Sequence, residues 1–251
     1  MKRRNLFILI IVLLLILLGL LIFYTSINVN NNYNYNLNNF DDNNKDDMNG
    51  GFKTIELGSN SRGTVELIGP IGNKNSNVKI AFIVGVHPLE YKVHDTLYDS
   101  LIAKSNSLNY CYYIYKINVT DNPDNYDIGR MNGQLLAKEF VVPDAISKNY
   151  DLVIDIHSNQ GTNGGSYKET NFIFAPLNEA NSKAFADKII ANIPPLLYYY
   201  PESQTSPNYV TIPIMKSGTP TIVYETYMYE SNEITKDYIN KLITTIDNLK
   251  Y

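Results

Sequence analysis

The feature that most limits the fold is the run IAFIVG at 80–85, which is apolar on both faces and stops at a glycine. Strands of this kind belong to largely parallel sheets with helices on both sides. Further runs rich in β-branched and aromatic residues predict strands over 63–69, 77–85, 110–118, 151–157, 171–176 and 219–226. Helix-like segments lie between several of them, over 89–105, 133–148, 178–193 and 231–249. The alternation predicts a single three-layer α/β domain, with a mostly parallel mixed sheet flanked by helices.

The first 51 residues differ sharply from the rest of the chain. Residues 1–5 are basic, and 6–24 form an uncharged apolar stretch long enough to cross a bilayer core. Because the stretch ends without a small-residue cleavage site, an uncleaved transmembrane signal anchor is favoured over a cleaved signal peptide. Residues 25–51 are dominated by Asn and Asp and predict a disordered tether. The basic flank then predicts a single-pass membrane protein with its domain, 52–251, outside the cytoplasm.

Charge and cysteine content exclude several kinds of partner and site. The net charge is −4 and no basic cluster lies beyond the membrane flank, which argues against nucleic acid as a partner. Cys111 is the single cysteine, so the domain has neither an internal disulfide nor a cysteine-based zinc site. No glycine-rich phosphate-binding pattern follows a predicted strand, so no nucleotide is expected either.

Three residues capable of chemistry stand at the ends of predicted strands. His87 follows the strand over 77–85, His157 ends the strand over 151–157, and Glu225 lies at the end of 219–226. Because ligands in open α/β sheets bind beyond the carboxyl ends of the strands, these side chains are expected at one edge. Glu90, three positions after His87, lies on the same face of a first helical turn. His87, Glu90 and His157 together match the His/Glu/His donor set of catalytic zinc sites.

Two neighbours of this set need an assignment, and the set itself has a simpler alternative. Asp155 faces the same side of its strand as His157 and is a candidate acceptor for that imidazole. His94, one helical turn after Glu90, is expected to face solvent rather than to bind metal. The alternative is that Glu90 only complements a helix dipole and the histidines are ordinary loop and strand-end residues.

Four motifs, in this order, resemble the zinc carboxypeptidase superfamily, particularly its branch with succinylglutamate desuccinylase and aspartoacylase. They are GVHPLE at 85–90, NPDNYDIGRMNG at 122–133, DLVIDIHSN at 151–159 and PTIVYET at 220–226. The resemblance implies that His87, Glu90 and His157 bind Zn²⁺. It also implies that Glu225 is the catalytic acid/base and that Arg130 is a catalytic and substrate-binding residue.

The DIGR element at 127–130 departs from the pattern of that family. Gly129 stands where the family usually has asparagine, and Asn132 is the candidate to replace it as a substrate-binding residue. A second arginine that the family places upstream has no counterpart. A surface salt bridge is the alternative interpretation of Arg130.

These observations predict a membrane-anchored zinc hydrolase of the cell envelope that cleaves an amide bond. The favoured substrate is a peptide, such as a cross-linking peptide of the cell wall, which makes the activity that of a carboxypeptidase or amidase. Because the chain ends soon after its last predicted helix, the extra C-terminal domain of the deacylase branch is not expected. One alternative is a deacylase of N-acyl amino acids. The other is a non-catalytic surface binding domain on the same fold.

Overall fold

The computed structural model describes residues 51–165, 167–202 and 204–251. The predicted basic N-terminus and transmembrane anchor, and all but the last residue of the predicted tether, lie outside these residues. Among the described residues, no helix combines the length and the apolar character needed to cross a bilayer.

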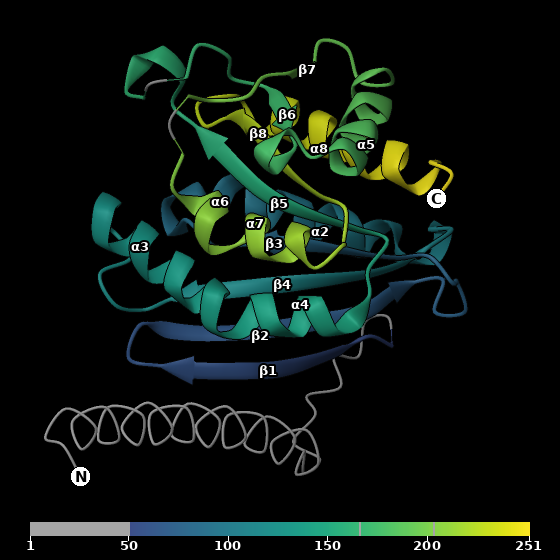
Figure 1. The fold of residues 1–251 in the computed structure, drawn as a ribbon, viewed down its shortest axis with the longest axis horizontal. Helices are drawn as coiled ribbons and strands as arrows, with labels where there is room; N and C mark the ends of the chain where they lie inside the picture. Colours follow the sequence, from purple (N-terminus) through teal and green to yellow (C-terminus); the bar gives the residue numbers. More distant parts are fainter. Residues whose placement is uncertain (1–50, 166, 203) are drawn as a thin grey trace, which may run out of the picture. The chain divides into compact units, whose positions relative to one another are not determined.

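An eight-stranded mixed sheet forms the centre of the domain (Figure 1). Its spatial order is β1-β2-β4-β3-β5-β8-β6-β7. The strands are β1 (Lys53–Asn60), β2 (Gly63–Gly72), β3 (Lys79–Val84), β4 (Cys111–Val119), β5 (Leu152–Asn159), β6 (Phe172–Phe174), β7 (Leu197–Tyr198) and β8 (Thr221–Tyr227). The central neighbours β4, β3, β5 and β8 are parallel, whereas β1–β2, β2–β4 and β6–β8 are antiparallel. The sheet is therefore mixed, with the predicted parallel arrangement at its centre.

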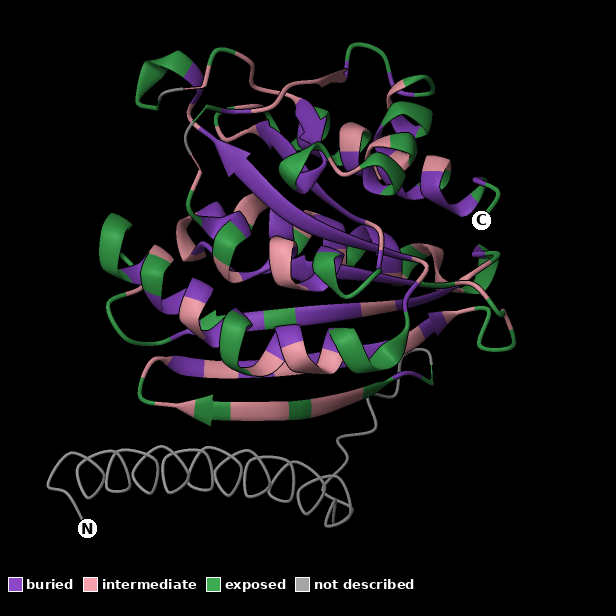
Figure 2. Cartoon of the chain, viewed as in Figure 1, coloured by how far each residue is buried: buried purple, intermediate pink, exposed green. Residues whose placement is uncertain are grey.

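Helices cover both faces of the sheet. One apolar core joins it to α2 (Tyr91–Lys104), α5 (Ala180–Ile190) and α8 (Asn232–Asp247). A second core joins the opposite face to α3 (Tyr126–Leu136), α4 (Val142–Lys148), α6 (Ser206–Tyr209) and α7 (Thr211–Lys216), which lie in front of the sheet in Figure 1. Figure 2 shows the central strands buried and the edge strand β1 largely exposed or half-buried. The predicted three-layer α/β fold is confirmed.

Short helical turns complete the connections between these elements. The 3₁₀ turns are η1 (Pro88–Glu90), η2 (Ser105–Ser107), η4 (Gly161–Asn163) and η5 (Pro176–Asn178). A π-helical segment, η3 (Ala137–Val141), joins α3 to α4. Turn η1 follows β3 directly and carries Glu90, one of the predicted metal ligands.

All six predicted strands are present, but other elements were missed or misplaced. Strand β1 has no buried side chain and therefore lacks the apolar run that marks a central strand. The helix expected to begin at 133 begins at Tyr126, because the side chain of Asn125 caps it by accepting from the backbone N–H groups of Asp127 and Ile128. The short elements β7, α6 and α7 fall in segments for which no structure was predicted.

Helix α3 passes very close to neighbouring backbone at two positions, and both are glycines. A Cβ atom on Gly133 would lie 2.0 Å from the backbone oxygen of Val86. A Cβ atom on Gly129 would lie 2.9 Å from the backbone oxygens of Asn122 and Pro123. Gly129 therefore cannot be exchanged for the asparagine of the family pattern without moving backbone.

The variant Gly133→Ala tests this close contact. Alanine in a helix is normally more favourable than glycine by about 1 kcal/mol. Here we expect the opposite, a loss of about 3 kcal/mol in the free energy of unfolding, because the new methyl group overlaps the Val86 carbonyl. Urea denaturation measures this. The control Met131→Ala, at an exposed position of the same helix, should change stability by less than about 0.5 kcal/mol. A stabilised Gly133→Ala variant would contradict the packing.

Candidate metal centre

His87, Glu90 and His157 meet at the carboxyl ends of β3 and β5. The carboxylate of Glu90 lies between the two imidazoles, with Oε1 2.9 Å from Nδ1 of His87 and Oε2 2.9 Å from Nδ1 of His157. Oε2 also accepts a hydrogen bond from the backbone N–H of Ser158, which fixes the carboxylate against β5. All three side chains are buried. The structure thus brings together the three predicted metal ligands.

The charges within this group are set by burial and by the short contacts. Burial lowers the pKa of His87 to about 3, so its imidazole is neutral. Burial would also lower the pKa of His157, but Asp155 and Glu90 outweigh it and hold that pKa well above its ordinary value. Burial opposes the charge of Glu90, yet His87 and His157 hold its pKa well below the ordinary value. A bound cation would take the place that the proton on His157 occupies beside Glu90.

The group fits a zinc ion in the kind and arrangement of its donors. One donor atom from each of His87, Glu90 and His157 lies within 4.8 Å of the other two. Both histidines present Nδ1 to the shared carboxylate, which leaves Nε2 for other partners. Two imidazoles and a carboxylate are the ligands of one class of catalytic zinc site, in which a fourth position stays open.

Asp155 lies behind His157, as its position on the strand predicts. Its Oδ2 is 3.0 Å from Nε2 of His157. The two atoms are not aligned for a hydrogen bond, so the contact is an ionic one. Asp155 is fully buried, and its charge favours the orientation in which His157 directs Nδ1 at Glu90.

The prediction that His94 faces solvent is wrong. His94 is buried, and its Nε2–H donates to the backbone oxygen of Ile156 at 2.9 Å. The reason is that α2 packs its buried residues, Val93 and Leu97 among them, against the sheet, and His94 belongs to the same side. Through this hydrogen bond His94 holds the backbone of β5 at Ile156, the residue before His157.

Glu225 stands beside His157 on the neighbouring strand. The two residues are paired in the register of β5 and β8. Asn159 donates from its Nδ2 to Oε2 of Glu225 at 3.1 Å, which leaves Oε1 for other contacts. Burial raises the pKa of the Glu225 carboxyl to about 8, against the opposing influence of His157 and the hydrogen bond from Asn159. The carboxyl group is therefore poised to hold or release a proton near neutral pH.

The raised pKa makes a prediction for the stability of the metal-free protein. A carboxyl whose pKa rises from 4.5 to about 8 on folding adds stability below pH 4.5 that disappears as the pH approaches 8. The glutamine in Glu225→Gln cannot ionise, so this position contributes no loss of folding stability as the pH rises. Between pH 5 and pH 8 we expect the variant to gain on the order of 3 kcal/mol relative to wild type. Urea unfolding in a chelator measures this, and equal pH dependence of the two proteins would contradict it.

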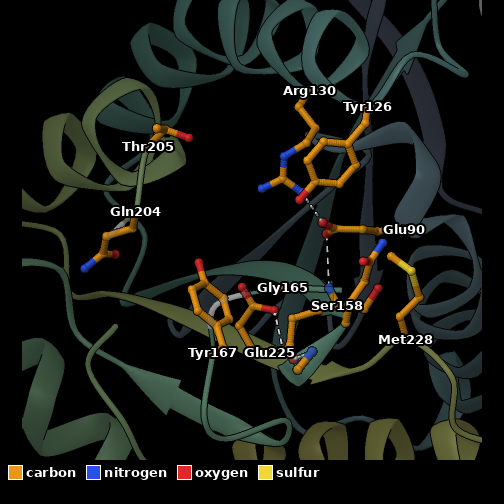
Figure 3. A pocket seen from close by; sticks show the side chains of 13 residues that line it. Glu90, Tyr126, Arg130, Ser158, Gly165, Tyr167, Gln204, Thr205, Glu225 and Met228 are labelled. Atoms are coloured by element: carbon orange, nitrogen blue, oxygen red, sulfur yellow. Dashed lines mark hydrogen bonds and ion pairs between the residues drawn. The ribbon is translucent and has the colours of Figure 1, made fainter. Parts of the chain in front are cut away.

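A cavity of about 180 Å³ lies beside Glu90 of the metal centre (Figure 3). Arg130 lines it from α3, donating from Nη1 to Oε1 of Glu90 at 2.9 Å and stacking over the ring of Tyr126 at 4.9 Å. Since Glu90 is only 2% exposed, this contact differs from the exposed surface pair of the alternative interpretation. Tyr167 and Glu225 lie on the other side of the cavity from Arg130.

Asn132 lines neither this cavity nor a smaller one that is lined by His87, His157 and Glu225. Its Nδ2 donates to the backbone oxygen and to Oδ2 of Asp121, at 2.9 and 3.0 Å, and so holds the loop before α3. The placement gives no support to a substrate-binding role for Asn132, which stays a prediction. Gly129 likewise contributes only close packing, as described above.

Three residues that contact the predicted site were not predicted from the sequence. Asn159 holds Glu225, Tyr167 lines the cavity, and Gln134 contacts the imidazole of His87. Asn159 had a usable signal, because it lies two positions after His157 and a strand presents alternate residues on one face. Gln134 and Tyr167 had none, since their positions depend on how α3 and the loop after β5 fold back.

No protein-family model and no curated protein sequence matches the chain. Solved structures do resemble it. A protein from Shewanella denitrificans assigned as a carboxypeptidase A has 15% identity and a TM-score of 0.55, over 80% of this chain and 65% of its own. A metallo-carboxypeptidase from Burkholderia cenocepacia has 14% identity and a TM-score of 0.51, over 78% and 64%.

A third match is the tripeptide-bound cell shape determinant Csd4 from Helicobacter pylori, with 13% identity and a TM-score of 0.51, over 78% of this chain and 55% of its own. The chain spans between 55% and 65% of the length of these three proteins. The finer resemblance to the deacylase branch stays a prediction. These structures show that the chain shares the fold of metallo-carboxypeptidases, and it carries a buried His/Glu/His group at the carboxyl ends of its central strands.

Proposed function

We propose that this protein is a zinc-dependent hydrolase that removes a residue from the carboxyl end of a peptide outside the cytoplasm, tethered by its N-terminal segment. The observation that carries the proposal is the pairing of Glu225 with His157, beside a complete His/Glu/His group. Glu225 contributes no atom to that group. A buried carboxyl beside His157 and next to a cavity suits proton transfer better than a purely structural role.

The chain's residues divide the chemistry among them. Zinc held by His87, Glu90 and His157 would acidify water and polarise a carbonyl group. Glu225 accepts a proton from the attacking water at Oε1, since Asn159 holds Oε2, and later donates it to the leaving amine. Arg130, a permanent cation fixed by its stack on Tyr126, binds the carboxylate or carbonyl oxygen of the substrate.

Tyr167 adds a hydrogen-bond donor to the cavity. Burial, together with Glu225, raises the pKa of its phenol, so the hydroxyl keeps its proton at neutral pH. The ring packs edge-on against Phe172 and Tyr199, which limits where the hydroxyl points. A fixed neutral donor beside Arg130 and Glu225 suits the oxygen of a substrate carbonyl.

A peptide substrate is supported by the neighbour Csd4, which was solved with a tripeptide bound. The cavity also has a polar lining, with Gln160, Gln204 and Ser158 beside the charged groups. Such a lining suits backbone amides and small polar side chains better than a long apolar acyl group. Peptides of the cell wall remain the favoured substrates for an enzyme placed outside the cytoplasm.

A comparison of peptide substrates, each incubated with the zinc-loaded full-length protein, tests the proposal. Peptides with a free terminal carboxylate should lose one residue, detected by mass spectrometry. The same peptides with an amidated terminus should react at least about 10-fold more slowly, because the contact with Arg130 is lost. Hydrolysis confined to N-acyl amino acids would favour a deacylase. Full zinc loading without any hydrolysis would favour a binding domain.

A further inference from the structure

One side chain outside the functional motifs contacts the second nitrogen of His87. It is Gln134, near the C-terminal end of α3, with its Nε2 3.2 Å from Nε2 of His87. Gln134 is only 2% exposed. Its Nε2 also lies 3.4 Å from the hydroxyl oxygen of Thr205, while its Oε1 has no hydrogen-bond partner among the described residues.

The placement of the proton on His87 decides what this contact is. A neutral imidazole carries one N–H, and a nitrogen that binds a metal needs its lone pair. In the metal-free site Nδ1–H of His87 donates to Oε1 of Glu90 and its Nε2 accepts from Gln134. When a metal ion occupies the cluster and takes the lone pair of Nδ1, the proton belongs on Nε2. An N–H of His87 would then face the NH₂ group of Gln134, which also only donates.

A half-turn of the Gln134 amide removes this conflict. The amide oxygen and nitrogen have nearly the same shape, so the turn exchanges them without moving the rest of the side chain. Oε1 then stands 3.2 Å from Nε2 of His87 and accepts a hydrogen bond from its N–H, and the Thr205 hydroxyl donates to the same oxygen. In either orientation one end of the amide lacks a partner, so the hydrogen bond to His87 decides between them.

We propose that Gln134 is a positioning residue for the metal centre. Its Oε1 accepts a hydrogen bond from Nε2–H of His87 and so keeps Nδ1 of that imidazole free and directed at the metal. The inference rests on the proposed function, because it requires a metal ion among His87, Glu90 and His157. Partners of this kind typically contribute 10- to 100-fold to metal affinity.

The backbone explains why Gln134 reaches His87. Gly133 precedes it and allows α3 to approach the turn after β3, where the nearest backbone oxygen is that of Val86. His87 is the next residue along that turn. The two histidines are thus held differently, since the partner of His157 is the charged Asp155 and that of His87 is a neutral amide.

Zinc affinity of the full-length protein, measured by competition with a chelator of known affinity, tests the proposal. Gln134→Leu keeps the volume but removes the acceptor, and should weaken zinc binding by about 10- to 100-fold. Gln134→Glu keeps an acceptor at the same place and should bind zinc at least as tightly as wild type. Gln134→Asn withdraws the acceptor by one methylene group and should fall between them.

Asn132→Leu provides the matched control. It also loses a buried amide on α3, but that amide holds Asp121 rather than a ligand, so zinc affinity should stay within about 2-fold of wild type. If Gln134→Leu does not fold, the comparison of the Glu and Asn variants decides. Equal affinity in all folded variants overturns the role of Gln134, whereas a wild type without zinc overturns the proposed function itself.

Discussion

Glu225→Gln should lower kcat/KM by about 1,000-fold while zinc stays bound. The glutamine has the same size and can still accept the hydrogen bond from Asn159, so the cavity keeps its shape. What it loses is the ability to take a proton from water and pass it to the leaving amine. Because Glu225 lies outside the group of metal donors, the affinity for zinc should change little.

Steady-state kinetics on a peptide with a free carboxyl end, together with zinc content, measures both effects. Glu233→Gln is a suitable control, since it makes the same change at an exposed position of α8 and should leave both quantities unchanged. Loss of zinc along with activity would place Glu225 among the ligands. Full activity in the variant would remove it from the mechanism.

The core of the fold was predictable because burial leaves a pattern in the sequence. Strands β3, β5 and β8 contain apolar runs and are buried on both faces. Their parallel direction follows from the helices that connect them. The site followed from the same pattern, because His87, His157 and Glu225 come at the carboxyl ends of those strands.

Elements that do not need a buried apolar run were not predictable. Strand β1 is at the edge and pairs with β2 alone, so all of its residues are exposed or half-buried. The start of α3 depends on a cap by Asn125 and on close packing at Gly129 and Gly133, which local helix propensity disfavours. Gly133 is needed because of the turn after β3, which lies far away in the sequence, and Gly129 because of the loop that folds back before α3.

The orientation of His94 shows the same limit at the level of one side chain. A histidine in a helix has no fixed preference for the solvent or the core, and only the packing of α2 on the sheet decides. Once the fold is known, its hydrogen bond to the Ile156 oxygen gives it a clear structural role. The metal ligands, in contrast, could be predicted from their residue types and their positions at strand ends, without knowledge of the packing.

Removal of either imidazole from the metal centre should abolish stable zinc binding. In His87→Ala and His157→Ala the content should fall from about one zinc per chain to near zero in elemental analysis. We expect each loss of affinity to exceed the 10- to 100-fold typical of an outer partner, because a donor atom itself is lost. The two variants also leave Glu90 without one of the imidazoles that hold its charge, which favours its protonation in the empty site.

His94→Gln separates the loss of a ligand from the loss of a buried histidine. The glutamine retains a donor for the Ile156 oxygen, so the end of β5 and the zinc content should both be preserved. Zinc retained in His87→Ala and His157→Ala would mean that the metal binds elsewhere. The turn η1 after β3 would then serve only to start a helix. Zinc lost in all three variants would show that binding depends on the integrity of this edge of the sheet rather than on two particular imidazoles.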